Sequence, residues 1–126
     1  MRKFIISIDA GTTSNRSILF DLKGNPVFSS QKEFTQYFPK NGWVEHDPEE
    51  IWKTTTKTLK EVIQKAKKLK GKILSIGITN QRETTVLWNK KTGKTVYKAI
   101  VWQDRRTEDY CEKLRKQNKD TAIFNK

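Results

Sequence analysis

The sequence predicts an α/β domain with a mixed sheet, in which three antiparallel strands are followed by a β-α-β crossover. Three observations support this fold class. Apolar runs separated by short turns occupy residues 3–34, an amphipathic helical pattern spans 48–69, and a continuous apolar run occupies 72–79. A strand, a long helix and a second strand join parallel neighbours through a right-handed crossover. We therefore expect antiparallel and parallel pairs in one sheet.

The three predicted antiparallel strands follow one another closely in the chain, at residues 3–8, 16–21 and 27–34. The two turns between them contain Gly11, and Gly24 with Pro26. Glycine and proline are typical of tight turns, because glycine permits unusual backbone angles and proline fixes φ. Short turns join antiparallel neighbours, so these strands are expected to form a meander.

The predicted long helix has clear signals at both ends. Asp47 is an N-cap carboxylate, Pro48 stands at the first helical position, and Gly71 is expected to be the C-cap residue. Apolar residues at spacings of three and four predict one buried face, made of Trp52, Leu59, Val62, Ile63, Ala66 and Leu69. Lysines cover the rest of the helix, which favours a solvated face over a binding site.

The elements that follow the helix are shorter, apart from the next strand. The apolar run at 72–79 is typical of a central strand in a parallel sheet. After it we expect a hairpin over 85–88 and 94–97, a short strand over 99–102 and a helix over 107–116. The tail at 117–126 shows no regular pattern.

The chain is strongly basic, with 26 Lys and Arg against 14 Asp and Glu and a net charge of +12. Such a charge attracts polyanions, including nucleic acid and anionic lipid surfaces. However, the basic residues are spread along the chain, without an Arg-rich arm or a set of zinc ligands. We interpret the charge as a solvated surface, which disfavours a nucleic-acid partner. A non-catalytic basic binding or structural module stays open as an alternative.

Cysteine usage and the N-terminal residues suggest a cytoplasmic protein. The single cysteine, Cys111, cannot form an intrachain disulfide and favours a reducing compartment. It lies in the second predicted helix, where we expect it to be packed and not to act as a nucleophile. The apolar stretch before Asp9 is too short for a signal peptide or a membrane span. We therefore expect no membrane partner.

The first turn, at residues 9–16, has the richest chemistry of the chain. Asp9 ends a buried strand and is placed to hold a hydrated cation. Gly11 permits a close approach of the backbone, as in anion-binding nests. Three consecutive hydroxyl side chains follow it: Thr12, Thr13 and Ser14. These residues predict a hairpin that binds phosphate and a metal ion, and an ordinary turn is the alternative.

Two further polar clusters also follow apolar strands. Arg82 and Glu83 come after the run at 72–79, and residues 102–106 come after the short strand. In open α/β sheets, ligands bind at the carboxyl ends of the strands. We therefore expect both clusters to lie near Asp9, around one ligand site.

Four runs of residues together resemble the N-terminal part of glycerol kinases, which belong to the FGGY family of carbohydrate kinases. They are DAGTTSNR (9–16), GWVEHDPEEIW (42–52), ITNQRETT (78–85) and AIVWQDRRT (99–107). The resemblance extends up to Thr121. It implies an RNase H-like sheet, as in actin and the Hsp70 ATPase. It also implies that residues 1–126 are an incomplete first kinase domain, with the second domain absent.

The resemblance implies ATP-dependent phosphorylation of glycerol to sn-glycerol 3-phosphate, with ATP and Mg²⁺ as cofactors and glycerol and ADP as further partners. The residues that match the family's contacts to nucleotide phosphates are Thr12, Thr13, Ser14 and Arg16. Asp9 matches the carboxylate that holds Mg²⁺ through water. The residues that match the family's glycerol contacts are Arg82, Glu83 and Trp102, the last as an aromatic wall.

The family's general base lies beyond the position that matches Lys126, and no P-loop pattern replaces it. Asp104 and Asp109 are candidates for a substitute base, although the resemblance gives neither of them that role. We therefore expect no catalytic residue, weak nucleotide binding and negligible phosphate transfer from these residues alone. We also expect self-association through exposed surfaces. Within the enzyme class, a related sugar kinase is the alternative.

Overall fold

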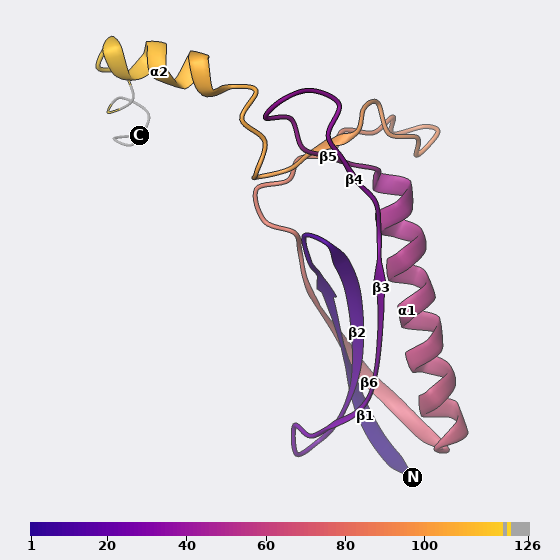
Figure 1. Cartoon of the computed structure of the whole chain (residues 1–126). Coiled ribbons are helices and arrows are strands. Elements are labelled where there is room, and N and C mark those ends of the chain that lie inside the picture. Colours follow the sequence, from indigo (N-terminus) through magenta and orange to yellow (C-terminus); the bar gives the residue numbers. More distant parts are fainter. Residues whose placement is uncertain (120, 122–126) are drawn as a thin grey trace.

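The computed structural model, which describes residues 1–119 and 121, has a four-stranded mixed sheet with one long helix packed on it (Figure 1). Its strands are β1 (Arg2–Ala10), β2 (Ser14–Asp21), β3 (Pro26–Glu33) and β6 (Gly71–Thr79), in the spatial order β3-β2-β1-β6. β1 pairs antiparallel with β2 and parallel with β6, and β2 pairs antiparallel with β3. The predicted meander and crossover are therefore confirmed.

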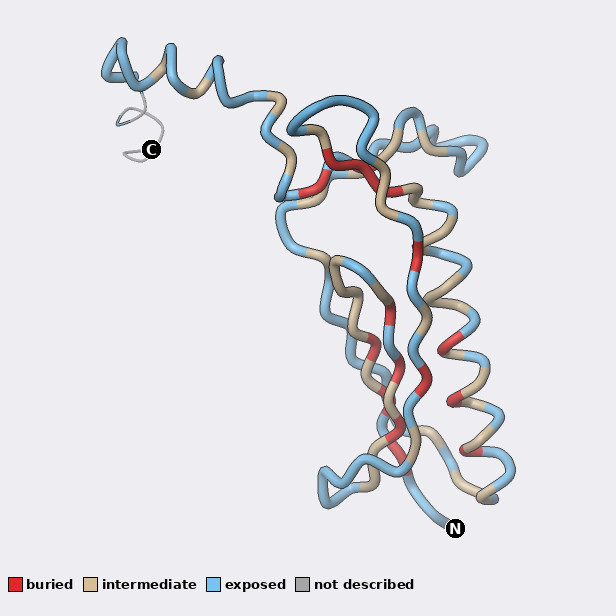
Figure 2. Tube along the Cα trace, viewed as in Figure 1, coloured by how far each residue is buried: buried red, intermediate tan, exposed pale blue. Residues whose placement is uncertain are grey.

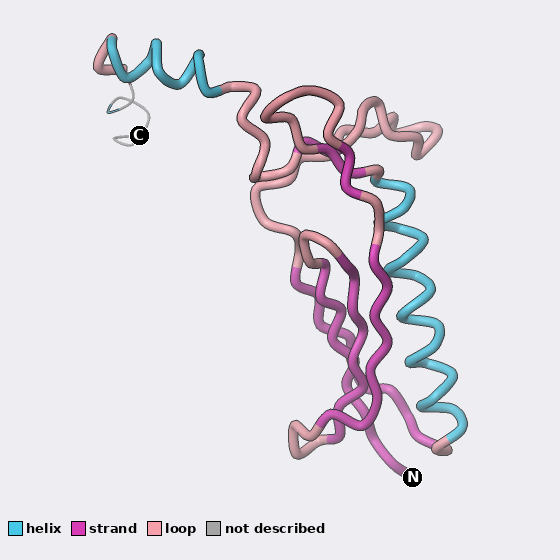
Figure 3. The backbone as a smooth tube through the Cα atoms, viewed as in Figure 1, coloured by secondary structure: helices cyan, strands magenta, loops and turns pink. Residues whose placement is uncertain are grey.

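A smaller sheet lies beyond the carboxyl ends of β1 and β6, beside the start of the long helix (Figure 3). It consists of β4 (Gln36–Tyr37), β5 (Glu45–His46) and β7 (Ala99–Ile100), all antiparallel. Strands of two residues have no periodicity, so the sequence pattern did not predict β4 and β5. The predicted strand at 99–102 is shorter than expected, because β7 contains only Ala99–Ile100.

The long helix α1 (Pro48–Lys68) begins where its signals predicted. Asp47 Oδ1 accepts a hydrogen bond from the Glu49 N–H at 2.9 Å. The predicted end is wrong, because the C-cap residue is Leu69, and Lys70 takes the left-handed conformation with φ of 52°. Gly71 already belongs to β6, where a Cβ would lie 2.1 Å from the ring of Phe4.

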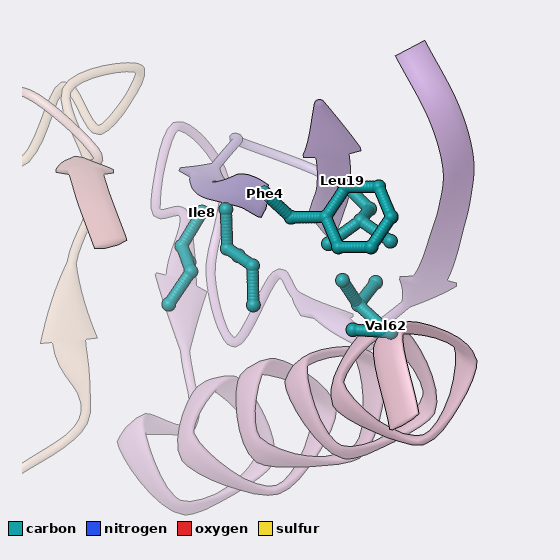
Figure 4. Close-up of a cluster of buried hydrophobic side chains, with 6 residues drawn as sticks. Phe4, Ile8, Leu19 and Val62 are labelled. Atoms are coloured by element: carbon teal, nitrogen blue, oxygen red, sulfur yellow. The ribbon is translucent and has the colours of Figure 1, made fainter. Parts of the chain in front are cut away.

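The hydrophobic core lies between α1 and one face of the large sheet (Figures 2 and 4). Side chains alternate across a strand and recur every three or four residues on a helix, so one set from each element faces the other. The buried apolar residues of this core are Phe4, Ile6, Ile8, Leu19, Val62 and Ala66.

The part of α1 nearer its N-terminus packs through polar side chains. Trp52 was predicted to lie on the buried face, but it is 65% exposed. Instead, Asn15 Nδ2 donates to Thr54 Oγ1 at 2.7 Å, and the hydroxyls of Ser17 and Thr58 lie 2.9 Å apart. An apolar pattern cannot predict such an interface, because its contacts are hydrogen bonds between hydroxyl and amide groups.

β6 is an edge strand of the described sheet and not the central strand that was predicted. It pairs with β1 on one side only. Leu74, Ile76 and Ile78 are 48%, 46% and 73% exposed, because α1 packs chiefly over β2 and β3. An apolar strand with an open edge is a surface on which another chain can pair.

The remaining predicted elements are only partly regular. The hairpin over 85–97 is a turn with one bridge, between Trp88 and Thr95. The second helix, α2 (Glu108–Lys116), stands apart from the sheet, and none of its described residues is buried, although Cys111 is half-buried (Figure 1). The tail at 117–126 lies partly outside the described residues. In the described part of the chain, every helix is too short or too polar to cross a membrane.

Candidate functional site

A pocket of about 420 Å³ lies at the carboxyl ends of β1 and β6. The first hairpin, the loop after β6 and the loop after β7 meet there, so the three polar clusters found in the sequence lie together. The pocket is lined by Asp9, Ala10, Gly11, Thr12, Thr79, Asn80, Gln81, Arg82, Glu83 and Trp102. Parallel β1 and β6 end at the same edge, which explains why two of the clusters are neighbours.

The backbone of the hairpin turn is fixed by its own hydrogen bonds. The Gly11 N–H donates to the Ser14 carbonyl at 3.0 Å, and a Cβ at position 11 would lie 2.8 Å from that oxygen. A larger residue would therefore displace the turn. The Thr12 carbonyl accepts from Gln36 Nε2 at 3.0 Å, and the Thr13 carbonyl accepts from a backbone N–H. The turn is thus held in shape by contacts within the chain.

The four residues predicted to bind phosphates do not all face the pocket. Thr12 lines it, whereas Thr13, Ser14 and Arg16 are absent from its lining. Ser14 begins β2, and its Oγ accepts a hydrogen bond from Gln31 Nε2 at 2.8 Å. The turn therefore separates the Thr12 hydroxyl from the other predicted phosphate ligands.

Asp9 and Arg16 lie opposite each other on β1 and β2 and form an ion pair. Arg16 Nη2 lies 3.1 Å from Asp9 Oδ2, and the side chains are 46% and 42% exposed. The pair uses Asp9 Oδ2, so Oδ1 can bind a hydrated cation. Mg²⁺ commonly keeps several waters and takes one or two carboxylates together with substrate phosphates. Asp9 can supply one such carboxylate. The described residues contain no cluster of three or more metal-binding side chains, so the other ligands of the ion would be waters and phosphates.

The other side of the pocket carries the residues predicted to bind glycerol. Arg82 and Glu83 are exposed on the loop after β6, and Glu83 has a left-handed backbone with φ of 55°. A non-glycine residue in this conformation is strained, and such strain is often found at functional sites. Across the pocket, Trp102 Nε1 donates to Thr12 Oγ1 at 3.3 Å. The indole and the hairpin hydroxyl are therefore in direct contact.

The loop that carries Trp102 is held by a buried ion cluster. Arg106 Nη2 lies 2.8 Å from both Asp104 Oδ2 and Glu45 Oε1. The Arg106 guanidinium also stacks on Trp43, 3.7 Å from the ring centroid. This cluster joins the segment before α1 to the loop after β7, and it fixes the position of Trp102.

Neither candidate for a substitute base lines the pocket. The side chain of Asp104 is 2% exposed, and hydrogen bonding from Arg106 lowers its pKa to about 2. A carboxylate that is this acidic and this tightly paired is a poor proton acceptor. Asp109 lies on α2, apart from the sheet (Figure 1). Asp104 is thus a structural residue.

A second chain of hydrogen bonds runs beside the pocket and was not predicted. Gln36 Oε1 lies 2.6 Å from His46 Nε2, and Gln81 Nε2 lies 3.1 Å from His46 Nδ1. His46 is fully buried, and this burial lowers its pKa. Being the only histidine of the chain, His46 could have been noticed, but Gln36 carries no sequence signal.

Comparison with known proteins identifies the family. Residues 4–126 match the N-terminal domain of the FGGY family of carbohydrate kinases. The chain belongs to this family. Glycerol kinase from Malacoplasma penetrans is 57% identical over 125 residues, which cover 99% of this chain and 25% of that protein. Glycerol kinase from Mycoplasmoides gallisepticum is 59% identical over 115 residues, covering 91% and 23%. The chain thus spans about a quarter of the length of these FGGY relatives.

Solved structures of FGGY kinases share the fold. Plasmodium falciparum glycerol kinase with ADP superposes with a TM-score of 0.82 at 40% identity, over 90% of this chain and 23% of that chain. Gluconate kinase from Lactobacillus acidophilus gives 0.90 at 25% identity, over 100% of this chain and 25% of that chain. The resemblance found in the sequence and the predicted RNase H-like fold are therefore confirmed.

Proposed function

We propose that this chain supplies the phosphate-binding and glycerol-binding side of an ATP-dependent glycerol kinase, which forms sn-glycerol 3-phosphate in the cytoplasm. One observation carries the proposal: the hairpin with Asp9 and Thr12, the loop with Arg82 and Glu83, and Trp102 line a single pocket. Relatives at 52% to 59% identity that are named glycerol kinases support this substrate over other FGGY substrates.

On the phosphate side, the proposed roles follow from the needs of phosphoryl transfer, which are positioning and charge neutralisation. Thr12 lies in the pocket and would contact the transferred phosphate. Thr13, Ser14 and Arg16 lie outside the pocket lining and would contact the rest of the nucleotide's phosphates. Asp9 would hold Mg²⁺ through water, and the ion would neutralise phosphate charge when bound.

On the acceptor side, a triol carries no charge, so its recognition depends on oriented hydrogen bonds. Glu83 accepts and Arg82 donates, and adjacent side chains of these two kinds can bind neighbouring hydroxyls. Trp102 would cover the carbon atoms of glycerol. Its indole N–H is bound to Thr12, so the orientation of the ring is set by the hairpin.

These residues include no general base in the proposed mechanism. Asp104 forms an ion pair with Arg106, and its low pKa opposes proton transfer from a hydroxyl to its carboxylate. A polypeptide of these 126 residues is therefore expected to bind nucleotide weakly and to transfer phosphate negligibly. A coupled assay with ATP, Mg²⁺ and glycerol measures this, and robust turnover would contradict it.

The substrate class is tested by titrating the ¹⁵N-labelled chain with glycerol, xylulose and gluconate. Glycerol is expected to shift the backbone amides of Arg82 and Glu83 and the indole signal of Trp102. The variant Glu83→Gln should weaken binding, whereas Glu112→Gln, on α2, should not. A stronger response to xylulose or gluconate would favour a related sugar kinase. Absence of any response at the pocket would refute the proposal.

A further inference from the structure

Gln81 is a pocket residue that has no role in the proposed function so far. It lines the pocket next to Arg82, and its Nε2 atom lies 3.1 Å from His46 Nδ1. Among the described residues, that contact is the one hydrogen bond made by the Gln81 side chain, and it does not use Oε1. The direction of this hydrogen bond decides which atom of the amide is left for a ligand.

The direction is set by a chain of contacts that starts at the hairpin. The Thr12 carbonyl can only accept, so Gln36 turns Nε2 toward it at 3.0 Å and Oε1 toward His46. An amide oxygen can also only accept, so His46 must donate from Nε2, 2.6 Å away. In a neutral imidazole, Nδ1 is then an acceptor.

The surroundings of His46 favour this neutral form. The side chain is fully buried, and the ring of Phe34 packs against it in an edge-on arrangement with the centroids 5.0 Å apart. The flanking carboxylates are engaged elsewhere, because Glu45 pairs with Arg106 and Asp47 pairs with Lys98. Burial without a paired carboxylate disfavours the imidazolium.

We propose that Gln81 Oε1 accepts a hydrogen bond from a hydroxyl of the bound substrate, and that His46 is the positioning residue that sets the orientation of the Gln81 amide. Neutral His46 accepts from Gln81 Nε2, which leaves Oε1 for the ligand. This inference rests on the proposed function and deepens it. With Gln81 Oε1, the site has a neutral acceptor as well as the charged acceptor Glu83, so it suits a polyol with several adjacent hydroxyl donors.

The same geometry discriminates against acidic substrates. A substrate carboxylate or phosphate has only acceptor oxygens, which cannot bond to an amide oxygen. For such a ligand to use Gln81, the amide would have to rotate and lose its hydrogen bond to His46 Nδ1. Gln81 therefore selects hydroxyl groups, because the Thr12 carbonyl sets the orientation of its amide through Gln36 and His46.

The first test measures the protonation state of His46 in the unaltered chain. Because the chain has one histidine, its ring nitrogens give a single pair of ¹⁵N signals. At neutral pH we expect an uncharged ring with its proton on Nε2. A ring with its proton on Nδ1 would overturn the inference without recourse to any variant.

The second test measures glycerol affinity by NMR in variants of the same chain. Gln81→Leu removes the acceptor and should weaken glycerol binding about three- to tenfold, as expected for one hydrogen bond. His46→Phe should cause a similar loss and alter the Gln81 side-chain amide signals. His46→Gln should restore much of the affinity, because it keeps a donor toward Gln36 and an acceptor toward Gln81. Gln64→Leu, exposed on α1, is the matched control.

The outcomes separate this inference from the proposed function. If glycerol shifts the NMR signals of Arg82 and Glu83, and if it binds the unaltered chain and Gln81→Leu with the same affinity, the inference is overturned and the proposed function stands. If glycerol causes no shift at Arg82, Glu83 or Trp102 in the unaltered chain, both are overturned. A loss of affinity in Gln81→Leu and His46→Phe, with retention in the control, supports the inference.

Discussion

The two ends of the α1–sheet unit are held together by different kinds of contact. At the end that holds the N-terminus of the chain, apolar side chains such as Phe4, Leu19 and Val62 fill the space between the sheet and the C-terminal half of α1. At the pocket end, apolar residues such as Val101 are accompanied by buried polar contacts. They include the hydrogen bond between Asn15 and Thr54 and the ion cluster of Arg106.

The apolar end therefore contributes mainly to the stability of the fold, whereas the polar end fixes the orientation of side chains. Apolar burial is roughly proportional to area and has no preferred direction. Hydrogen bonds and ion pairs weaken steeply when their geometry is wrong, so they can fix the direction of a side chain. A pocket that must present donors and acceptors to a small polyol needs directional contacts, whereas the core needs only to be filled.

The largest loss of stability is expected from a cavity in the apolar end. Leu19 is fully buried, and Leu19→Ala should lower the free energy of unfolding by about 4 kcal/mol. Urea titration followed by circular dichroism measures this change. Leu22→Ala is the matched control, because Leu22 is 57% exposed in the turn after β2. Equal losses in the two variants would show that the core does not dominate stability.

A smaller and more local loss is expected at the polar end. Arg106→Met leaves the carboxylates of Asp104 and Glu45 buried without their partner, which costs about 3 kcal/mol. NMR should show altered signals for Trp102 but native signals for Val62. Arg115→Met is the control, because its pair with Glu112 is exposed on α2 and contributes less than about 1 kcal/mol. Loss of the core signals would contradict a separation of the two ends.

Strong acid should weaken the polar end by protonating Asp104. The pKa of Asp104 is lowered from 3.8 to about 2 by hydrogen bonding from Arg106, so the unfolded chain binds the proton more readily. The stabilisation is therefore complete above pH 3.8 and is lost as the pH falls toward about 2, for a total of about 2 kcal/mol. Asp104→Asn should flatten the decline of unfolding free energy in this window, and an unchanged slope would contradict the assignment.

The open edge of β6 should cause weak self-association between copies of the chain. Ile78 is 73% exposed on this edge strand, and Ile78→Lys should weaken the association roughly tenfold, or about 1.4 kcal/mol. Sedimentation at several concentrations measures it. Leu87→Lys, 68% exposed outside the regular strands, is the control. A strict monomer at high concentration would contradict the prediction.

The smallest effect on stability is expected at the ion pair of the hairpin. Asp9 and Arg16 are both about half exposed, so Asp9→Asn should change the free energy of unfolding by less than about 1 kcal/mol. In contrast, the dependence of ADP binding on Mg²⁺ should disappear. Calorimetry with and without Mg²⁺ compares the two. Binding that depends on Mg²⁺ equally in Asp9→Asn would exclude Asp9 as the ligand of the ion.

Local patterns in the sequence were sufficient for the strands of the large sheet, for the presence of both helices and for part of the site. Apolar runs predicted β1 and β2, and the signals at Asp47 and Pro48 predicted the start of α1, because such signals act within a few residues. Motifs likewise led to Asp9, Thr12, Arg82, Glu83 and Trp102, which all line the pocket.

The tertiary structure alone decided which residues share a surface. Thr13, Ser14 and Arg16 lie outside the pocket lining, β6 is an edge strand, and Gln36 and His46 link the hairpin to Gln81. The physical reason is that a hydrogen bond depends on its partner's position and direction. That partner is often far away in the chain: Arg106 pairs with Glu45, 61 residues before it. Periodicity indicates which face of an element is apolar, but only the folded chain determines whether that face is covered and what it contacts.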